Sequence, residues 1–266
     1  GHSREIMSRL GPGGKLFAFD QDLDALKNAI DDDRFMLINE NFRFIKRFLR
    51  FHGIKQVDGI LADLGVSSHQ FDVAERGFST RFEAELDMRM NQKDEISAYN
   101  VINEYDEQEI SRVLFNYGEL KNARAMANVI VLARQEAPIK NSEQLKQILA
   151  RFLPGHKSNK ILAQIYQAIR IEVNQEMDVL KEFLEQSLEI LKPGGRLSVI
   201  SYHSLEDRLV KRFVKNGMFE GEPERDFFGN FEVPFKTIEK LIVPSDEKIA
   251  LNNRARSAKL RVAEKK

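Results

Sequence analysis

Residues 57–68 read VDGILADLGVSS, and this stretch decides the fold that the rest of the chain follows. It begins as an apolar run bounded by turn-forming residues, which is typical of a buried strand in a parallel sheet. The run ends in a carboxylate, Asp63, and a small, turn-prone segment follows. Ligands of open α/β sheets bind beyond the carboxyl ends of the strands, so an acid there predicts a ligand contact. The same pattern also fits an N-cap for the next helix.

The composition narrows the class of protein. The chain has 266 residues, of which 41 are basic and 41 acidic, and this length fits one large α/β domain or a domain with an insertion. The absence of cysteine excludes disulfides, thiolate metal sites and a cysteine nucleophile. No long uncharged apolar run or signal-peptide pattern occurs, so we expect a cytoplasmic protein. The zero net charge argues against a basic surface overall but leaves room for a local basic patch.

Around the central stretch, apolar residues alternate between the spacing of helices and that of strands. This alternation predicts a doubly wound, Rossmann-like α/β sheet with right-handed crossovers. Helices are expected at residues 3–10, 23–30 and 42–51. Strands are expected at residues 15–20, 35–39, 57–63 and 197–202, with two further candidates at 238–243 and 258–262.

The middle of the chain has a different pattern. Residues 69–81 form an irregular polar stretch that is long for a connection, and such stretches are usually functional. From residue 96 to about 153 the spacing is helical with no intervening strand, which indicates an inserted helical subdomain. We therefore assign residues 1–95 and 168–266 to the core and residues 96–167 to an inserted subdomain that recognises the substrate.

Three polar residues follow expected strands, namely Asp20, Asp63 and His203. Together they predict one sheet edge that contacts a nucleotide-like ligand. Asp20 lies at the spacing from a glycine turn at which an acid reaches ribose hydroxyls, although it also fits a helix cap. Ser204 is expected to be the N-cap of the next helix, with Asp207 three residues on. We find no phosphate-binding glycine–lysine loop and no metal-ligand spacing, so neither phosphoryl transfer nor a metal is expected.

Eight short motifs are spread along the chain. They are GHS at 1–3, DLGVSS at 63–68, ERGFS at 75–79, LDMRM at 86–90, QAIRIEVN at 167–174, KPGGRL at 192–197, ISYHSLEDR at 200–208 and RARSAKLR at 254–261. With these motifs the chain resembles a known family, RsmH (MraW), the bacterial methyltransferases that act on the cytosine N4 of small-subunit ribosomal RNA. Their number, their order and their spread along the chain make the resemblance specific.

The resemblance implies a class I S-adenosylmethionine-dependent methyltransferase with an inserted helical subdomain. It implies methylation of a cytidine in the decoding region of 16S rRNA, within the small ribosomal subunit. The family's cofactor contacts, carried over by motif, fall on Gly1, His2, Asp20, Phe42, Asp63 and Gln70.

The chemistry of the implied reaction needs a proton acceptor. The cytosine N4 lone pair is delocalised into the ring, so a group that fixes the amine and takes its proton would help. Asp63 and His203 are the catalytic candidates, although His203 also fits a structural histidine. The target base must leave its stack to be reached.

Basic residues near the end of the chain are the expected phosphate contacts. Arg254 and Arg256, in an expected loop, are the strongest, and Lys259 and Arg208 complete the set. Each also fits a solvated surface with salt-bridge partners.

The chain starts with a helical pattern, whereas a parallel α/β domain normally opens with a strand. We therefore expect an N-terminally truncated protein that binds the cofactor weakly and is impaired as an enzyme. The alternatives are a catalytically impaired RNA-binding protein of the same fold and a methyltransferase of another nucleic acid. A nicotinamide dehydrogenase is more distant. The sequence leaves the oligomeric state open.

Overall fold

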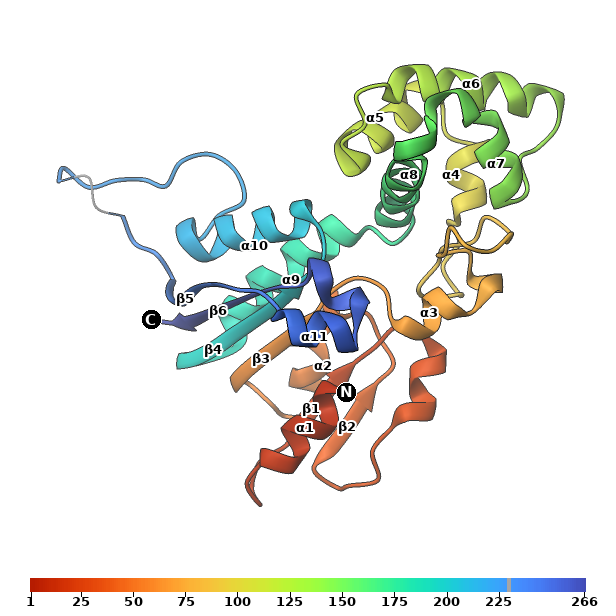
Figure 1. The fold of residues 1–266 in the computed structure, drawn as a ribbon. Coiled ribbons are helices and arrows are strands. Elements are labelled where there is room, and N and C mark those ends of the chain that lie inside the picture. Colours follow the sequence, from red (N-terminus) through yellow and green to blue (C-terminus); the bar gives the residue numbers. More distant parts are fainter. Residues whose placement is uncertain (229–230) are drawn as a thin grey trace. The chain divides into compact units, whose positions relative to one another are not determined.

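A computed structural model describes residues 1–228 and 231–266 and shows a mixed α/β chain (Figure 1). The chain divides into two compact units. The first contains residues 1–65 and 177–266, and the second contains residues 66–176. The predicted insertion, residues 96–167, falls wholly inside the second unit, which begins thirty residues earlier in the sequence.

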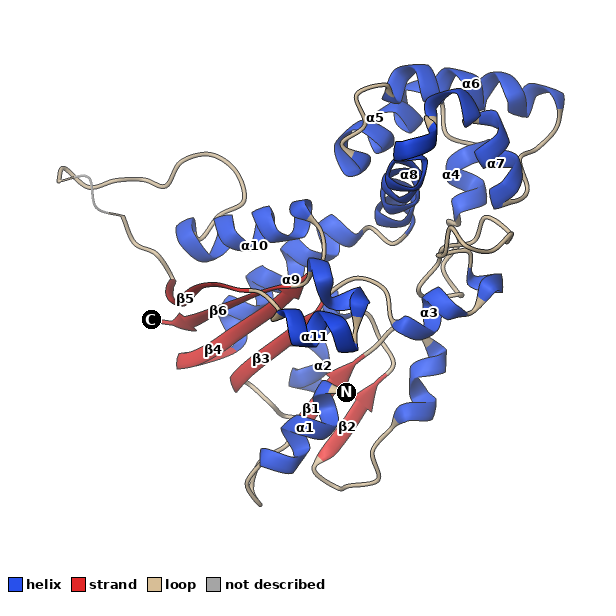
Figure 2. Cartoon of the chain, viewed as in Figure 1, coloured by secondary structure: helices blue, strands red, loops and turns tan. Residues whose placement is uncertain are grey.

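The strands of the first unit form two sheets (Figure 2). In the smaller sheet, β1 (Leu16–Phe19) pairs in parallel with β2 (Phe35–Ile38). In the larger sheet, β3 (Val57–Asp63) pairs in parallel with β4 (Leu191–Ser201). Strand β6 (Lys259–Lys265) then lies antiparallel between β4 and β5 (Phe235–Ile242), which gives the order β3-β4-β6-β5.

The prediction of one continuous sheet is therefore wrong. Strands β1 and β3 form no ladder with each other among the described residues, so their hydrogen bonds join different sheets. Both sheets nevertheless pack on one apolar core, because Phe17 and Phe19 of β1 contact the same cluster as Ile60 of β3. Each expected strand has a counterpart in the structure, although β4 begins at Leu191, six residues before the expected start. Asp20 follows a strand of one sheet, whereas Asp63 ends a strand of the other.

Helices supply most of the core of the first unit. Leu49 of α2 (Ile45–Phe51), Leu184 of α9 (Glu176–Ile190) and Phe213 of α10 (Ser204–Asn216) are all buried in one cluster. The short 3-10 turn η2 (Phe42–Phe44) leads into α2, where a single helix was expected. Four further elements complete this unit: α1 (His2–Arg9), α11 (Asp246–Leu251), the 3-10 turn η6 (Asn253–Ser257) and the 3-10 turn η1 (Leu23–Asn28), where an α-helix was expected.

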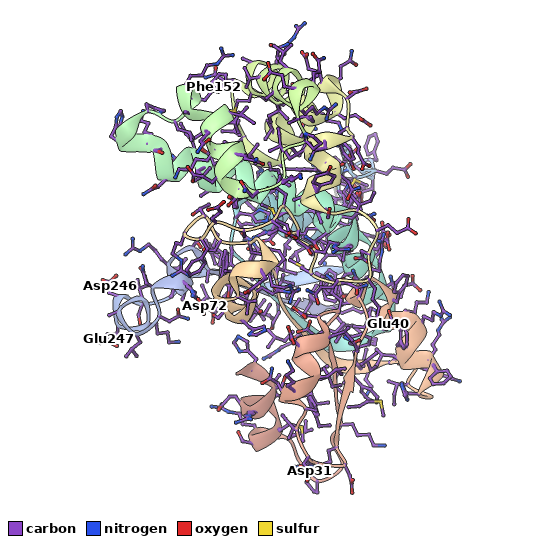
Figure 3. The ribbon with its side chains drawn as sticks, turned by 90° about the vertical axis from the view of Figure 1, so that its right-hand side faces the viewer. Asp31, Glu40, Asp72, Phe152, Asp246 and Glu247 are labelled. Atoms are coloured by element: carbon purple, nitrogen blue, oxygen red, sulfur yellow. The ribbon has the colours of Figure 1, made fainter. Side chains whose placement is uncertain are left out.

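The second unit is helical, as the spacing from residue 96 to about 153 predicted. Its core consists of aliphatic side chains that are almost completely buried, such as Ile102, Leu114, Ile130 and Ile165. Figure 3 labels Asp72 and Phe152, which lie at the ends of α3 and η4. The elements are α3 (Ser68–Asp72), η3 (Ala74–Arg76), α4 (Ala98–Asn103), α5 (Glu107–Gly118), α6 (Ala123–Glu136), α7 (Ser142–Ile148), η4 (Ala150–Phe152), η5 (Gly155–Lys157) and α8 (Ser158–Val173).

Two of the sequence motifs meet inside this unit. The buried Asn174 accepts a hydrogen bond on Oδ1 from the backbone N–H of Met90 at 2.7 Å. Its Nδ2 donates to the carbonyl oxygen of Met88 at 2.8 Å. An amide has both a donor and an acceptor, so one side chain satisfies two buried backbone groups. The two motifs therefore hold the segment before α4 against the end of α8.

None of the helices in the described ranges is long and apolar enough to span a lipid bilayer.

We expect Asn174→Ala to lower the free energy of unfolding by about 1–3 kcal/mol, because it leaves buried backbone groups without partners. Urea denaturation followed by circular dichroism measures this loss. The matched control is Asn128→Ala on the exposed face of α6, where Asn128 Nδ2 donates to Glu107 Oε2 at 3.1 Å. Equal losses in both variants would contradict the role given to Asn174.

Candidate active site

Asp63 ends strand β3, and its carboxylate is held by a neighbouring strand. Residue Asp63 pairs with Ile200 in the parallel register, which brings Tyr202, just beyond β4, close to it. The Tyr202 hydroxyl donates a hydrogen bond to Asp63 Oδ1 at 2.9 Å. On the other oxygen, His2 Nε2 lies 3.4 Å from Asp63 Oδ2. The Asp63 side chain remains 41% exposed, so the carboxylate is both positioned and accessible.

The alternative interpretation of Asp63, as an N-cap, is wrong. Helix α3 is capped by Ser67, whose hydroxyl oxygen accepts a hydrogen bond from the backbone N–H of Gln70 at 3.2 Å. The side-chain oxygen of Gln70 accepts in return from the backbone N–H of Ser67 at 2.9 Å. This is a capping box, and it leaves Asp63 available for another role. It also gives the buried Gln70 a structural function in the second unit, while its carried-over cofactor contact stays a prediction.

Tyr202 is a residue that the sequence analysis missed. Burial and the negative charge of Asp63 raise the pKa of its hydroxyl above the ordinary value. The group therefore stays neutral and keeps its proton for the hydrogen bond to Asp63. The sequence did contain a signal for Tyr202. It is the first residue after β4, at the same end of its strand as Leu64, the first residue after β3.

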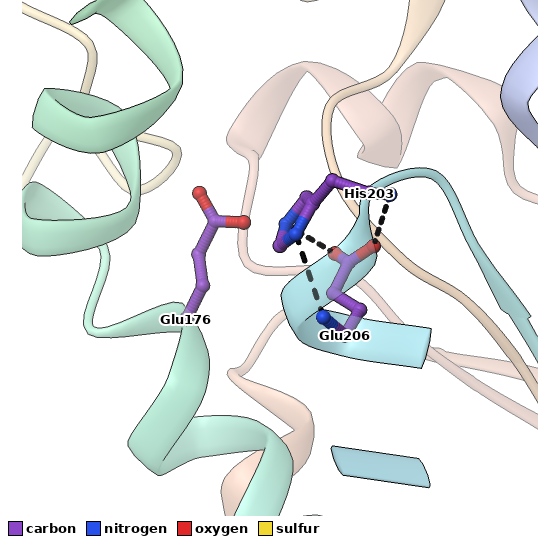
Figure 4. Close-up of side chains that lie close together, drawn as sticks. All are labelled: Glu176, His203 and Glu206. Carbon is purple, nitrogen blue, oxygen red and sulfur yellow. Dashed lines mark hydrogen bonds and ion pairs between the residues drawn. The ribbon is translucent and has the colours of Figure 1, made fainter. Parts of the chain in front are cut away.

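His203 caps helix α10. Its Nδ1 accepts a hydrogen bond from the backbone N–H of Glu206 at 3.4 Å, and Glu206 Oε2 accepts from the backbone N–H of His203 at 3.3 Å (Figure 4). Glu206 Oε2 also accepts from the backbone N–H of Tyr202 at 2.8 Å. The prediction of Ser204 as N-cap with Asp207 three residues on is therefore wrong by one residue. Neutral histidine has an acceptor nitrogen, and the glutamate at the third helical position completes the capping box.

This cap limits what His203 can do chemically. Because Nδ1 is the acceptor, the proton of neutral His203 belongs on Nε2. Nε2 lies 3.2 Å from Glu206 Oε1, without hydrogen-bond geometry among the described residues. Both side chains are buried, at 8% and 2% exposed. A base needs a free lone pair, so the arrangement favours a structural role for His203, and its catalytic role stays a prediction.

Two further predicted cofactor residues lie in the first unit. Asp20 follows β1 and is exposed, and its Oδ1 accepts from the backbone N–H of Asp22 at 2.9 Å. The N-cap of η1 is Asp22, so the capping alternative for Asp20 is wrong. Phe42 is half-buried, and its ring meets that of Phe183 edge to face at 5.1 Å between centroids. Gly1 is exposed and precedes α1, the helix that begins with His2.

The predicted RNA-binding residues differ in their surroundings. Arg254 and Arg256 are exposed on the short 3-10 helix η6 (Asn253–Ser257), where a loop was expected. Arg208 is exposed on α10. Lys259 instead lies with its Nζ 3.3 Å from Asp207 Oδ2, so its ammonium already has a carboxylate partner.

Asp207 joins helix α10 to strand β6. Its other oxygen accepts a hydrogen bond from Arg261 Nε at 2.7 Å. Burial opposes ionisation of the Asp207 carboxyl, but Arg261 and Lys259 outweigh it and hold the pKa below the ordinary value. Asp246 and Glu247 lie in the first turn of α11, where acids complement a helix N-terminus (Figure 3).

Asp63 is an accessible carboxylate at the carboxyl end of a parallel strand, which is where open α/β sheets bind their ligands. Residues 1–266 match the MraW methylase family, and the chain belongs to that family. The resemblance drawn from the eight motifs is thus confirmed.

The chain is similar over its whole length to three bacterial proteins that are each named ribosomal RNA small subunit methyltransferase H. The protein of Flavobacterium johnsoniae is 78% identical over 265 residues, which cover 100% of this chain and 88% of the relative. The protein of Flavobacterium psychrophilum is 73% identical over 266 residues, which cover 100% of this chain and 91% of the relative. The protein of Bacteroides thetaiotaomicron is 53% identical over 267 aligned positions, which cover 100% of this chain and 88% of the relative.

We expect His203→Ala to destabilise the protein by about 0.5–2 kcal/mol, because it removes an N-cap. His203→Asn, which supplies a good capping oxygen, should keep both the stability and the methyltransferase activity. Thermal melts and a methyl-transfer assay test the pair. Normal stability with lost activity in His203→Asn would instead establish a catalytic histidine.

Proposed function

We propose that this chain transfers a methyl group from S-adenosylmethionine to the N4 amine of a cytidine in the decoding region of small-subunit ribosomal RNA. The name of the Flavobacterium johnsoniae relative, which is 78% identical to this chain, supports the substrate class. The observation that carries the proposal is the Asp63 carboxylate, accessible and fixed by the Tyr202 hydroxyl at 2.9 Å.

The residues of the first unit fit the proposed cofactor. S-adenosylmethionine, when bound, supplies a methyl group already activated on a sulfonium. Asp20 is an exposed carboxylate, the type of acceptor that ribose hydroxyls require. The half-buried Phe42 offers an apolar ring for a base. His2 lies close to Asp63, so the start of α1 belongs to the same part of the site.

Asp63 is proposed to act on the nucleophile. An ionised carboxylate accepts hydrogen bonds from the exocyclic amine, fixes its N–H bonds and takes the proton released when the N–C bond forms. The hydrogen bond from Tyr202 fixes the orientation of this carboxylate. Holding the amine in line with the methyl group lowers the activation barrier, because the two reacting atoms are already aligned.

The basic segment of η6 is proposed to bind the RNA backbone. Arg254 and Arg256 are exposed and lie two residues apart on one short helix. The helical unit is proposed to contribute to substrate recognition, as the sequence predicted for residues 96–167.

The direct test supplies S-adenosylmethionine and small ribosomal subunits from cells that lack this protein. Digestion of the product RNA followed by mass spectrometry should reveal N4-methylcytidine. RNA binding without any methylated nucleoside would favour the alternative, an RNA-binding protein of the same fold.

We expect Asp63→Asn to lower the rate of methyl transfer by about 10²–10⁴, the usual contribution of a positioned base. RNA affinity should stay unchanged. The matched control is Asp58→Asn at the other end of β3, where Asp58 pairs with Lys192 at 2.6 Å on the surface. A fully active Asp63→Asn variant would exclude this carboxylate as the acceptor.

We expect Arg254→Ala with Arg256→Ala to weaken RNA binding and to reduce the slope of log affinity against log salt by about 1–2. Cofactor affinity and thermal stability should not change. Arg9→Ala with Arg196→Ala removes the same charge from two exposed ion pairs and serves as the control. A loss of stability with normal RNA binding would instead show that η6 is structural.

A further inference from the structure

The end of the 3-10 turn η2, helix α2 and the turn after it form a basic segment with no acidic residue. Residues 43–55 contain five lysines and arginines and no aspartate or glutamate, in a chain that has equal numbers, 41 and 41, of basic and acidic residues. The five residues are Arg43, Lys46, Arg47, Arg50 and Lys55.

Two of the five have a structural role. Arg43 and Lys46 form ion pairs with Glu182 and Glu189 of α9. The hydrogen bond from Arg43 to Glu182 raises the pKa of the Arg43 guanidinium. These pairs hold α2 on α9 and fix which face of α2 points to solvent.

The other three form the outward face. Arg47, Arg50 and Lys55 are exposed, and none of them has a carboxylate partner in the described part of the chain. Arg50 and Lys55 line an open hollow of about 340 Å³ together with Gly53. Gly53 has a φ of +75°, a conformation that suits glycine, and it turns the chain so that Lys55 comes beside the end of α2.

An exposed aromatic ring accompanies these cations. Phe51 is 82% exposed, and its ring meets that of His52 edge to face at 5.2 Å between centroids. The Phe51 ring buries little of its surface in the fold, so its face is open to a ligand. Surfaces for single-stranded nucleic acid combine cations that follow the phosphates with aromatic rings on which bases stack.

The position of this surface separates it from the proposed active site. All residues of this surface precede β3 in the sequence, and the chain runs directly from them into the first residue of that strand. Asp63 is the last residue of the same strand. Seven residues of parallel strand span about 20 Å at about 3.3 Å per residue. A nucleotide on Phe51 therefore cannot be the one whose amine meets Asp63.

We propose that Arg47, Arg50, Lys55 and Phe51 form a second RNA-binding surface. It holds the phosphates and one unstacked base of the substrate RNA at a distance from the target cytidine. This inference rests on the proposed function for the identity of the RNA. The attraction of a helix C-terminus for cations accounts only for Arg50, which lies in the last turn of α2.

The test uses Arg47→Glu, Arg50→Glu and Lys55→Glu together in the full chain. Affinity for whole small-subunit rRNA should fall at least tenfold at about 0.1 M salt, and the salt slope should become shallower by about 2. Affinity for a short stem-loop that holds only the target cytidine should stay within about twofold. Phe51→Ala should weaken binding of the whole RNA with little change in the salt slope, because stacking involves no phosphate charge.

The matched control carries Arg9→Glu, Lys27→Glu and Lys181→Glu, which change the charge equally at cations already paired with acids of their own helices. Cofactor titration and thermal melts check the fold of every variant. The proposal would be overturned if the control lost as much affinity for the whole RNA as the α2 variant, or if the α2 variant kept its full affinity. It would also be overturned if the α2 variant bound RNA normally but no longer bound vesicles of acidic phospholipid.

The two proposals fail in different ways. If the unaltered chain yields no methylated cytidine but the α2 variant still loses RNA affinity, only the proposed function fails. If the unaltered chain methylates its RNA and the α2 variant binds whole rRNA normally, only this surface fails.

Discussion

The parallel pairing of β3 with β4 is the constraint on which the candidate site depends. Register along this pair places Ile200 beside Asp63, so the residues just beyond β4 come within reach of the carboxylate. A shift of one residue would turn every side chain of the strand to the opposite face. The hydrogen bond between Tyr202 and Asp63 exists only in this register. The pairing of apolar strand residues thus positions a polar site at the end of the strands.

Much of the fold could be predicted from the sequence, because apolar spacing reflects burial. Strands form at the stretch ending in Asp63 and before Asp20 and His203, as the spacing predicted. The expectation that the stretch ending in Asp63 is a buried strand is wrong, because every residue of β3 is partly or fully exposed. Spacing gives no information on which strands pair, and the division between β1 and β3 was therefore missed. Pairing depends on hydrogen bonds between residues far apart in the chain, and no local pattern records them.

The candidate site was predicted less completely than the fold. The main reason is that the sequence did not show which residue caps helix α10. The segment Tyr202-His203-Ser204 offers two N-caps one residue apart, and serine is the commoner choice. The structure uses His203, because Glu206 then falls at the third helical position and accepts from the backbone beside Tyr202. Composition alone cannot choose between the two, since each has an acid three residues on. The choice decides whether His203 is a base or a cap.

Capping and ion pairing also show which polar groups are left for ligands. Ser67 caps α3 and Asp22 caps η1, so neither Asp63 nor Asp20 is needed as a cap, although both follow strands. Among the cations, Lys259 is held by Asp207, whereas Arg47 and Arg50 lie exposed without a carboxylate partner in the described ranges. A net charge of zero is thus compatible with RNA binding, because local pairing neutralises some cations and leaves others in groups. The distribution of partners, more than the number of charges, separates structural residues from those that can bind a substrate.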